Sequence, residues 1–112
     1  METLMERANR LEAEGIFLGG PAKFFKTAGQ KQLVTLLSQG LTPHSKVLDI
    51  GCGCLRGGYW LIHFLSKGCY FGIEPNKKML EAGTRILLEP ELADLKKPKF
   101  DYNSNFDFTV FD

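Results

Sequence analysis

A predicted strand, a glycine turn and a predicted helix follow one another directly, and this order constrains the fold most. The stretch reads Val47-Leu48-Asp49-Ile50-Gly51-Cys52-Gly53-Cys54-Leu55-Arg56-Gly57-Gly58. Its first residues are typical of a strand buried on both faces, and the apolar segment 59–65 that follows is typical of a covered helix. Glycines between two such elements let backbone approach a ligand closely. The turn is therefore predicted to bind a nucleotide-like ligand.

Further elements are predicted on both sides of this stretch. Strands, each a short apolar run, are expected at residues 46–50, 69–74 and 98–102. Helices, with apolar residues at helical spacing or throughout, are expected at residues 2–14, 22–39, 57–66 and 76–88. Glu89 and Pro90 end the last helix, and a charged connecting segment is expected at residues 91–97.

This alternation of strands and helices predicts βαβ units with parallel pairing and right-handed crossovers, which is an α/β fold. Residues 1–40 are expected to form an N-terminal helical extension, and residues 41–112 the α/β domain.

The composition is typical of an ordinary globular protein and indicates neither a nucleic-acid nor a membrane partner. Of the 112 residues, 44% are apolar and 24% are charged, and the net charge is +1. The densest basic clusters are lysine pairs at 77–78 and 96–97, a weak footprint for nucleic acid. No apolar run approaches the roughly 20 residues that span a bilayer, and the N-terminus lacks the layout of a signal peptide. Three cysteines without disulfide-framework spacing favour a reducing, cytoplasmic compartment.

Two carboxylates are predicted to lie beside the glycine turn. Gly51 and Gly53 flank one small residue, and Asp49 precedes the first of these glycines by two residues. Glu74 lies 25 residues beyond Asp49 (74 minus 49), at the end of the second strand, where an acid can bind the two hydroxyls of a ribose. A dinucleotide fingerprint would have glycine in place of Arg56, and Asp49 would set negative charge beside a pyrophosphate. The pattern therefore argues against a dinucleotide.

These residues resemble the class I S-adenosylmethionine-dependent methyltransferases. Asp49-Ile50-Gly51-Cys52-Gly53 resembles motif I of the family, and Phe71-Gly72-Ile73-Glu74 resembles its acidic second-strand end. The string 51–58 is similar to a bacterial subgroup with a GCG-x-LRGG turn, and the resemblance extends over roughly residues 22–112. It implies S-adenosylmethionine as cofactor. It also implies a Rossmann-like three-layer parallel sheet, of which this chain supplies the first half, about three of seven strands.

The resemblance also implies roles for individual residues. The methionine portion of the cofactor would be lined by Gly51, Cys52 and Gly53, with Asp49 near its ammonium group. Glu74 would hold the ribose hydroxyls. Two residues after the third strand align with the position that contacts adenine, Asn105 and Phe106.

The chain departs from the family pattern at two of these places. The usual residue at the adenine position is an aspartate, and Asp107 lies close enough to compete for that role. Leu55 replaces the third glycine of the family's G-x-G-x-G turn. The exit of the turn is therefore expected to differ, with Gly57 and Gly58 supplying slack.

Two functions are consistent with these observations. The favoured one is methyl transfer from S-adenosylmethionine to an unidentified acceptor, where a protein mainly positions the two reactants and this chain is the cofactor-binding N-terminal part. No residue is identified as a general base, so no catalytic residue is assigned. The alternative is a non-catalytic fragment or binding module that assembles with another chain. Three parallel strands would leave a hydrophobic edge after the third strand, through which the chain could self-associate.

Other conspicuous residues have structural interpretations. The cysteines and His63 lack the spacing of a zinc site, so no metal is predicted. His63 is expected in the core or at a helix edge rather than as a base. Arg56 has two open alternatives, an ion pair with an acid such as Asp49 or a contact with the cofactor carboxylate. Core packing is expected for Tyr59, Trp60, Phe106, Phe108 and Phe111.

Overall fold

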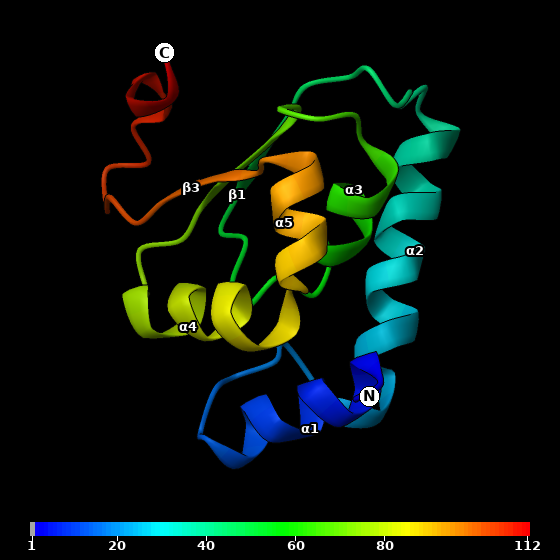
Figure 1. The fold of residues 1–112 in the computed structure, drawn as a ribbon, viewed down its shortest axis with the longest axis vertical. Coiled ribbons are helices and arrows are strands. Elements are labelled where there is room, and N and C mark those ends of the chain that lie inside the picture. The colour runs from blue at the N-terminus through cyan, green and yellow to red at the C-terminus, as the bar shows by residue number, and fades with distance from the viewer. Residues whose placement is uncertain (1) are drawn as a thin grey trace.

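A computed structural model describes residues 2–112 and contains a parallel sheet with helices packed against it (Figure 1). The strands are β1 (Val47–Ile50), β2 (Tyr70–Ile73) and β3 (Lys99–Asp101), in the order β1-β2-β3. Both pairs are parallel. The predicted strands, their parallel pairing and the α/β class are confirmed.

The helices begin and end near residues that the sequence marks as caps. They are α1 (Leu4–Ala13), α2 (Phe25–Ser38) with a short 3-10 turn η1 (Ala22–Phe24) before it, α3 (Gly58–Phe64) and α4 (Lys77–Ala82). Thr3 caps α1 through a hydrogen bond from the Glu6 amide, and Asn76 caps α4 through one from the Met79 amide. The predicted helices are thus present, each shorter than expected by a few residues.

The segment after α4 differs from the prediction. The helix does not continue as an α-helix to residue 88 but widens into a π-helical turn, η2 (Gly83–Leu87), in which the Leu88 amide donates to the Gly83 carbonyl at 3.1 Å. The charged segment expected at 91–97 is a further helix, α5 (Pro90–Lys96). Pro90 stands at its first position, which favours a helix start, but Leu92 is its one buried residue, so the apolar pattern was too weak to reveal it.

Helices cover one face of the sheet. Figure 1 shows α2, α3 and α5 on the right of the strands, with α3 in contact with α2, α5 and β2. The core lies between these helices and the sheet, and its largest fully buried side chains include Leu55, Ile62, Leu65 and Leu87. The N-terminal helices belong to the same packing, because the Arg7 guanidinium on α1 binds the Leu87 carbonyl at 3.1 Å and the Glu89 carboxylate at 2.8 Å.

The opposite face of the sheet is largely open. Leu48 and Ile50 on β1 are 38% and 57% exposed. The C-terminal 3-10 turn η3 (Phe108–Phe111), red in Figure 1, reaches this side, and the Phe111 ring lies 5.3 Å from the Phe71 ring. The expectation of core packing for the aromatic tail is wrong for Phe106 and Phe108, which are 39% and 57% exposed, because the helices that bury core residues lie on the other face.

The sheet has two edge strands among the described residues, β1 and β3, so an edge is present after the third strand, as expected, and a second one lies at β1. The Val47 and Gly51 amides donate across to β2, to the Cys69 and Ile73 carbonyls, both at 2.8 Å. Because backbone groups alternate in direction along a parallel strand, those of Leu48 and Ile50 point away from β2. No fourth strand pairs with them in residues 2–112. On β3 the Asp101 carbonyl accepts from the Glu74 amide that follows β2, so by the same alternation the backbone groups of Phe100 point away from β2.

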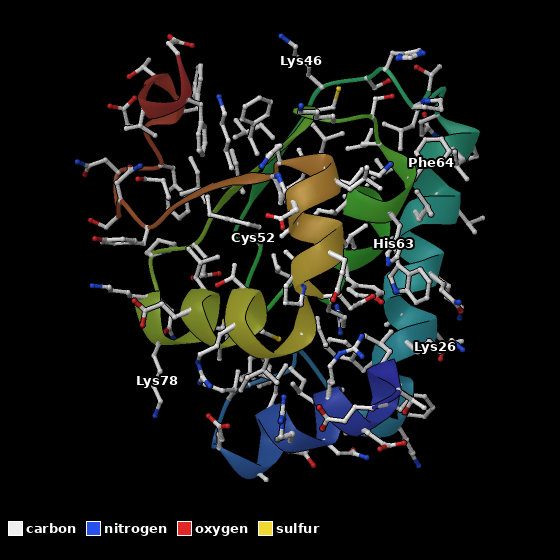
Figure 2. All side chains as sticks on the ribbon, in the orientation of Figure 1. Lys26, Lys46, Cys52, His63, Phe64 and Lys78 are labelled. Atoms are coloured by element: carbon white, nitrogen blue, oxygen red, sulfur yellow. The ribbon has the colours of Figure 1, made fainter. Side chains whose placement is uncertain are left out.

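The positions of the lysines and the lengths of the helices bear on the expectations about nucleic acid and membranes. Figure 2 shows Lys26, Lys46 and Lys78 pointing outward on three different sides of the molecule. These three lysines therefore do not share one face of the molecule. None of the helices in residues 2–112 is long and apolar enough to cross a membrane.

Candidate functional site

A cavity of ≈ 440 Å³ opens at the carboxyl end of β1 and β2. This volume is within the range of sites for small organic ligands. The cavity is lined by Phe17, Leu18, Gly19, Gln32, Asp49, Ile50, Gly51, Cys52, Gly53, Cys54, Arg56, Gly57, Glu74 and Met79. The structure thus brings Asp49, Gly51, Cys52, Gly53 and Glu74 to one site, as predicted. Asn105 and Phe106 do not line it.

The glycine turn has the backbone shape that brings main chain to the cavity. Gly51 and Gly53 have φ angles of +74° and +58°, in the left-handed region that glycine adopts without strain. A Cβ added at Gly51 would meet no atom within 4 Å. Glycine is therefore favoured at this position by the backbone conformation and not by a lack of space. The space beside it is open to a ligand.

Leu55 holds the same left-handed conformation without being glycine. Its φ is +74°, its amide donates to the Cys52 carbonyl at 3.1 Å, and its side chain is fully buried. The expectation that Gly57 and Gly58 supply slack at the exit is wrong. These glycines instead permit close packing, because an added Cβ would collide with Gln32 at the first and with the Tyr70 hydroxyl at the second. Burial of the Leu55 side chain offsets the strain that glycine would avoid.

Asp49 is a half-buried carboxylate whose position is fixed by β2. The Tyr70 hydroxyl donates to Asp49 Oδ2 at 2.6 Å. Burial raises the pKa of Asp49 above its ordinary value, the Tyr70 hydrogen bond lowers it, and the nearby Glu74 charge raises it further. A positive ligand group beside Asp49 would relieve this cost, so the site favours a cation.

Glu74 ties the end of β2 to the glycine turn. Its Oε1 accepts a hydrogen bond from the Gly53 amide, and its Oε2 accepts one from the Asn76 amide, both at 2.9 Å. Each carboxylate oxygen has a second lone pair that can accept from a ligand hydroxyl. The two backbone bonds hold the carboxylate at the cavity wall before any ligand arrives.

Cys52 and Cys54 contribute shape rather than reactivity. Both are buried, and burial raises the pKa of Cys52 to about 12 and that of Cys54 to about 11. Both thiols therefore stay protonated at neutral pH and are poor nucleophiles or metal ligands. Figure 2 shows Cys52 in the interior, and Gly72 makes room for its Sγ, since an added Cβ there would lie 2.9 Å away. Within residues 2–112, no three His, Cys, Asp or Glu side chains gather to hold a metal ion.

One wall of the cavity comes from a segment whose contribution to the site was not predicted. Phe17, Leu18 and Gly19, between α1 and α2, face the glycine turn, and Gln32 and Met79 complete the lining. The sequence shows this segment only as a glycine-rich turn. The one other sequence feature that could have indicated a role in the site is an aromatic residue between glycines, Phe17. This residue is 68% exposed in the structure.

The residues predicted near adenine lie in a loop that is organised by its own hydrogen bonds. The Asn103 side chain donates to Asp101 Oδ2 at 2.6 Å and accepts from the Asp107 amide at 2.7 Å. Asp107 in turn caps η3, where it accepts from the Thr109 hydroxyl and amide, and these bonds lower the pKa of Asp107. Asn105 and Phe106 are exposed between these anchors.

Three further expectations concern residues on or beside α3. His63 is exposed, with its ring 4.7 Å from the Tyr59 ring, so the helix-edge placement is confirmed. Core packing is confirmed for Tyr59, whereas Trp60 is only partly buried. Arg56 makes no ion pair with Asp49, and instead its Nη1 donates to the Gly19 carbonyl at 3.0 Å.

Together these groups form a polar cavity with one guanidinium, two carboxylates and a left-handed backbone turn at its floor. A cavity with these groups can bind a small polar molecule that carries hydroxyl groups, a positive charge and a negative charge. Comparison of the chain with family models, with curated proteins and with solved structures gave no match.

Proposed function

We propose that the chain is the S-adenosylmethionine-binding part of a class I methyltransferase, with a Rossmann-like sheet of which these are the first strands. One observation carries the proposal. Asp49 and Glu74 stand at the carboxyl ends of neighbouring parallel strands and line one cavity with the Gly51–Gly53 turn. In open α/β sheets, ligands bind at this end of the strands.

The residues fit the chemical groups of this cofactor. Glu74 is held by two backbone amides and retains lone pairs for the ribose hydroxyls. Asp49 faces the same cavity and favours a cation, which suits the ammonium of the methionine portion. The open side of Gly51 leaves room for close approach of backbone to ligand.

The chemistry follows from positioning. When bound, the cofactor supplies an electrophilic methyl group on a sulfonium. The residues of this chain bind and orient it, and alignment of two reactants can supply a large part of the rate enhancement. The Cys52 and Cys54 thiols, protonated and buried, take no part as nucleophiles. The methyl acceptor is not assigned.

Calorimetric titration with S-adenosylhomocysteine tests the proposal. We expect saturable binding to the wild-type chain and a loss of about tenfold or more in affinity for both Asp49→Asn and Glu74→Gln, because each removes a charge-assisted hydrogen bond of about 1.5–3 kcal/mol. Asp94→Asn, which removes an exposed carboxylate on α5, is the matched control and should leave affinity unchanged. Absence of binding by a folded wild-type chain, or equal affinity in all variants, would contradict the proposal.

A second candidate, a binding module that assembles with another chain, is favoured by the open face of the sheet. Leu48 and Ile50 present exposed apolar side chains beside free backbone groups of β1. An edge of this kind is a template for an added strand. Self-association through β1 is the form of this candidate that the chain can show by itself.

Sedimentation velocity over a range of protein concentrations tests this second candidate. Self-association would appear as a concentration-dependent increase in the sedimentation coefficient, and Leu48→Lys should reverse it by placing charge on the exposed strand. Val34→Lys, which alters another exposed apolar residue on α2, is the control. A single monomeric species at every concentration would rule out self-association through β1.

A further inference from the structure

Two large apolar residues line the cavity and are exposed to solvent. Phe17, in the segment between α1 and α2, is 68% exposed, and Ile50, the last residue of β1, is 57% exposed. The other described large apolar residues with comparable exposure, such as Phe24 and Phe108, do not belong to the lining. The apolar surface that the cavity presents to solvent is therefore concentrated at Phe17 and Ile50.

The position of Phe17 is fixed by the residues on either side of it. Ile16 and Leu18 are buried, at 7% and 4% exposed, so the segment is anchored in the core before and after the phenylalanine. The Phe17 carbonyl oxygen also lies 3.7 Å from Cys54 Sγ in the glycine turn. The packing thus holds the backbone and leaves the aromatic residue uncovered. Phe17 is presented at the cavity by a fixed segment and not by a loose chain end.

The charged groups of the lining belong to other segments. Asp49 lies on β1, Arg56 in the glycine turn and Glu74 at the end of β2, and in the proposed function the two carboxylates bind polar groups of the cofactor. Phe17 and Ile50 have no side-chain donor or acceptor to offer. Contact with an uncharged apolar group would remove their apolar surface from water, which is favourable. The excess of carboxylates in the lining disfavours an anionic group at the same place.

We infer that Phe17 and Ile50 form an acceptor subsite, which binds an uncharged aromatic or aliphatic part of the methyl acceptor beside the cofactor. The inference rests on the proposed function and goes further, because it names the chemical class of the acceptor. Exposed apolar residues at a ligand cavity are a mark of a binding surface. The acceptor subsite therefore selects a small apolar molecule over a nucleic acid or an acidic peptide.

Two phenols that differ in one group test the inference on the full chain. p-Cresol carries a methyl group where 4-hydroxybenzoate carries a carboxylate. In a chemical-shift titration of the isotope-labelled chain, saturated with S-adenosylhomocysteine, p-cresol should shift the signals of Phe17 and Ile50. It should bind about fivefold or more tightly than 4-hydroxybenzoate, which the carboxylates of the lining repel.

Substitution of each residue separates the acceptor subsite from the cofactor site. Phe17→Ser should weaken p-cresol binding by about fivefold, and Ile50→Ser by about threefold, because each removes apolar surface that the probe would cover. Both variants should keep the affinity for S-adenosylhomocysteine. Phe24→Ser is the matched control, since Phe24 is 54% exposed and lies outside the lining, and it should change neither affinity.

Three results would overturn the inference. They are equal affinity for the two phenols, unchanged p-cresol binding in Phe17→Ser, and weakened S-adenosylhomocysteine with unchanged p-cresol in that variant, which would make Phe17 a cofactor contact. If S-adenosylhomocysteine binds to folded wild type and p-cresol does not, the inference alone fails. If S-adenosylhomocysteine does not bind, the proposed function fails and the inference fails with it.

Discussion

Leu55 offers a measurement of how backbone strain and side-chain burial balance in the glycine turn. Its φ of +74° is a conformation that costs an L-residue about 1–2 kcal/mol, while its side chain is fully buried. Replacing it by alanine removes the side chain and keeps the strain. Replacing it by glycine removes both. The pair Leu55→Ala and Leu55→Gly therefore separates the two contributions.

The magnitudes follow from these two facts. Loss of a buried leucine side chain costs about 3–5 kcal/mol in each variant. Relative to alanine, glycine relieves about 1–2 kcal/mol of backbone strain in the folded protein. The greater conformational freedom of glycine in the unfolded chain lowers the free energy of unfolding by about 0.5–1 kcal/mol. Leu55→Gly should thus be as stable as Leu55→Ala, or more stable by up to about 1.5 kcal/mol.

Leu61 provides the matched control, because it is buried to a similar degree (4% exposed) but lies inside the right-handed helix α3. There the glycine variant should be less stable than the alanine variant by about 1 kcal/mol. The assay is urea unfolding followed by circular dichroism, with the free energy of unfolding of all four variants compared. If the glycine variant is the less stable one at Leu55 by the same margin as at Leu61, the reasoning about strain in the turn is wrong.

Two further predictions concern titration. Iodoacetamide should alkylate Cys69, which is partly exposed, faster than Cys52 or Cys54, whose pKa values burial raises to about 12 and about 11; peptide mass spectrometry of the native protein checks this, and equal rates would contradict it. Because burial raises the pKa of Asp49 in the free protein and a bound ammonium favours its ionised form, affinity for S-adenosylhomocysteine should be full above that pKa and fall as the pH drops through it. Calorimetry at several pH values measures the slope, which should be smaller in Asp49→Asn.

Much of the fold and part of the site could be predicted from local signals. The strands at 47–50 and 70–73 are apolar runs, each bounded by loops, and glycines follow the first of them. Asp49 and Glu74 end up at one cavity because parallel strands place their carboxyl ends at the same edge of a sheet. The placement of both carboxylates at one cavity follows from the order of strands and helices along the chain. It could therefore be predicted from the sequence.

The features that were missed depend on contacts between distant segments. Phe17–Gly19 lines the cavity because α1 packs against η2, α2 packs against α3, and the segment between α1 and α2 contacts the glycine turn. No local sequence pattern predicts that contact. Burial of the Leu55 side chain offsets the strain of its left-handed conformation. The residue type at the third position of the turn does not show that this side chain is buried. Helix α5 has a single buried residue, Leu92, so its periodicity was weak. Exposure of Phe108 reflects which face of the sheet lacks helices, which is again a property of the assembled layers.

The central claim is that the glycine turn and its neighbouring carboxylates bind a nucleoside that carries an amino-acid tail. Its most direct test is an amide chemical-shift titration of the isotope-labelled chain with S-adenosylhomocysteine. The amides of Gly51, Gly53 and Gly19 line or flank the cavity and should shift saturably. Those of Gly40 and Gly68, in loops outside the cavity lining, should stay fixed. No shifts at saturating ligand, or shifts centred on Gly40 and Gly68, would contradict the account.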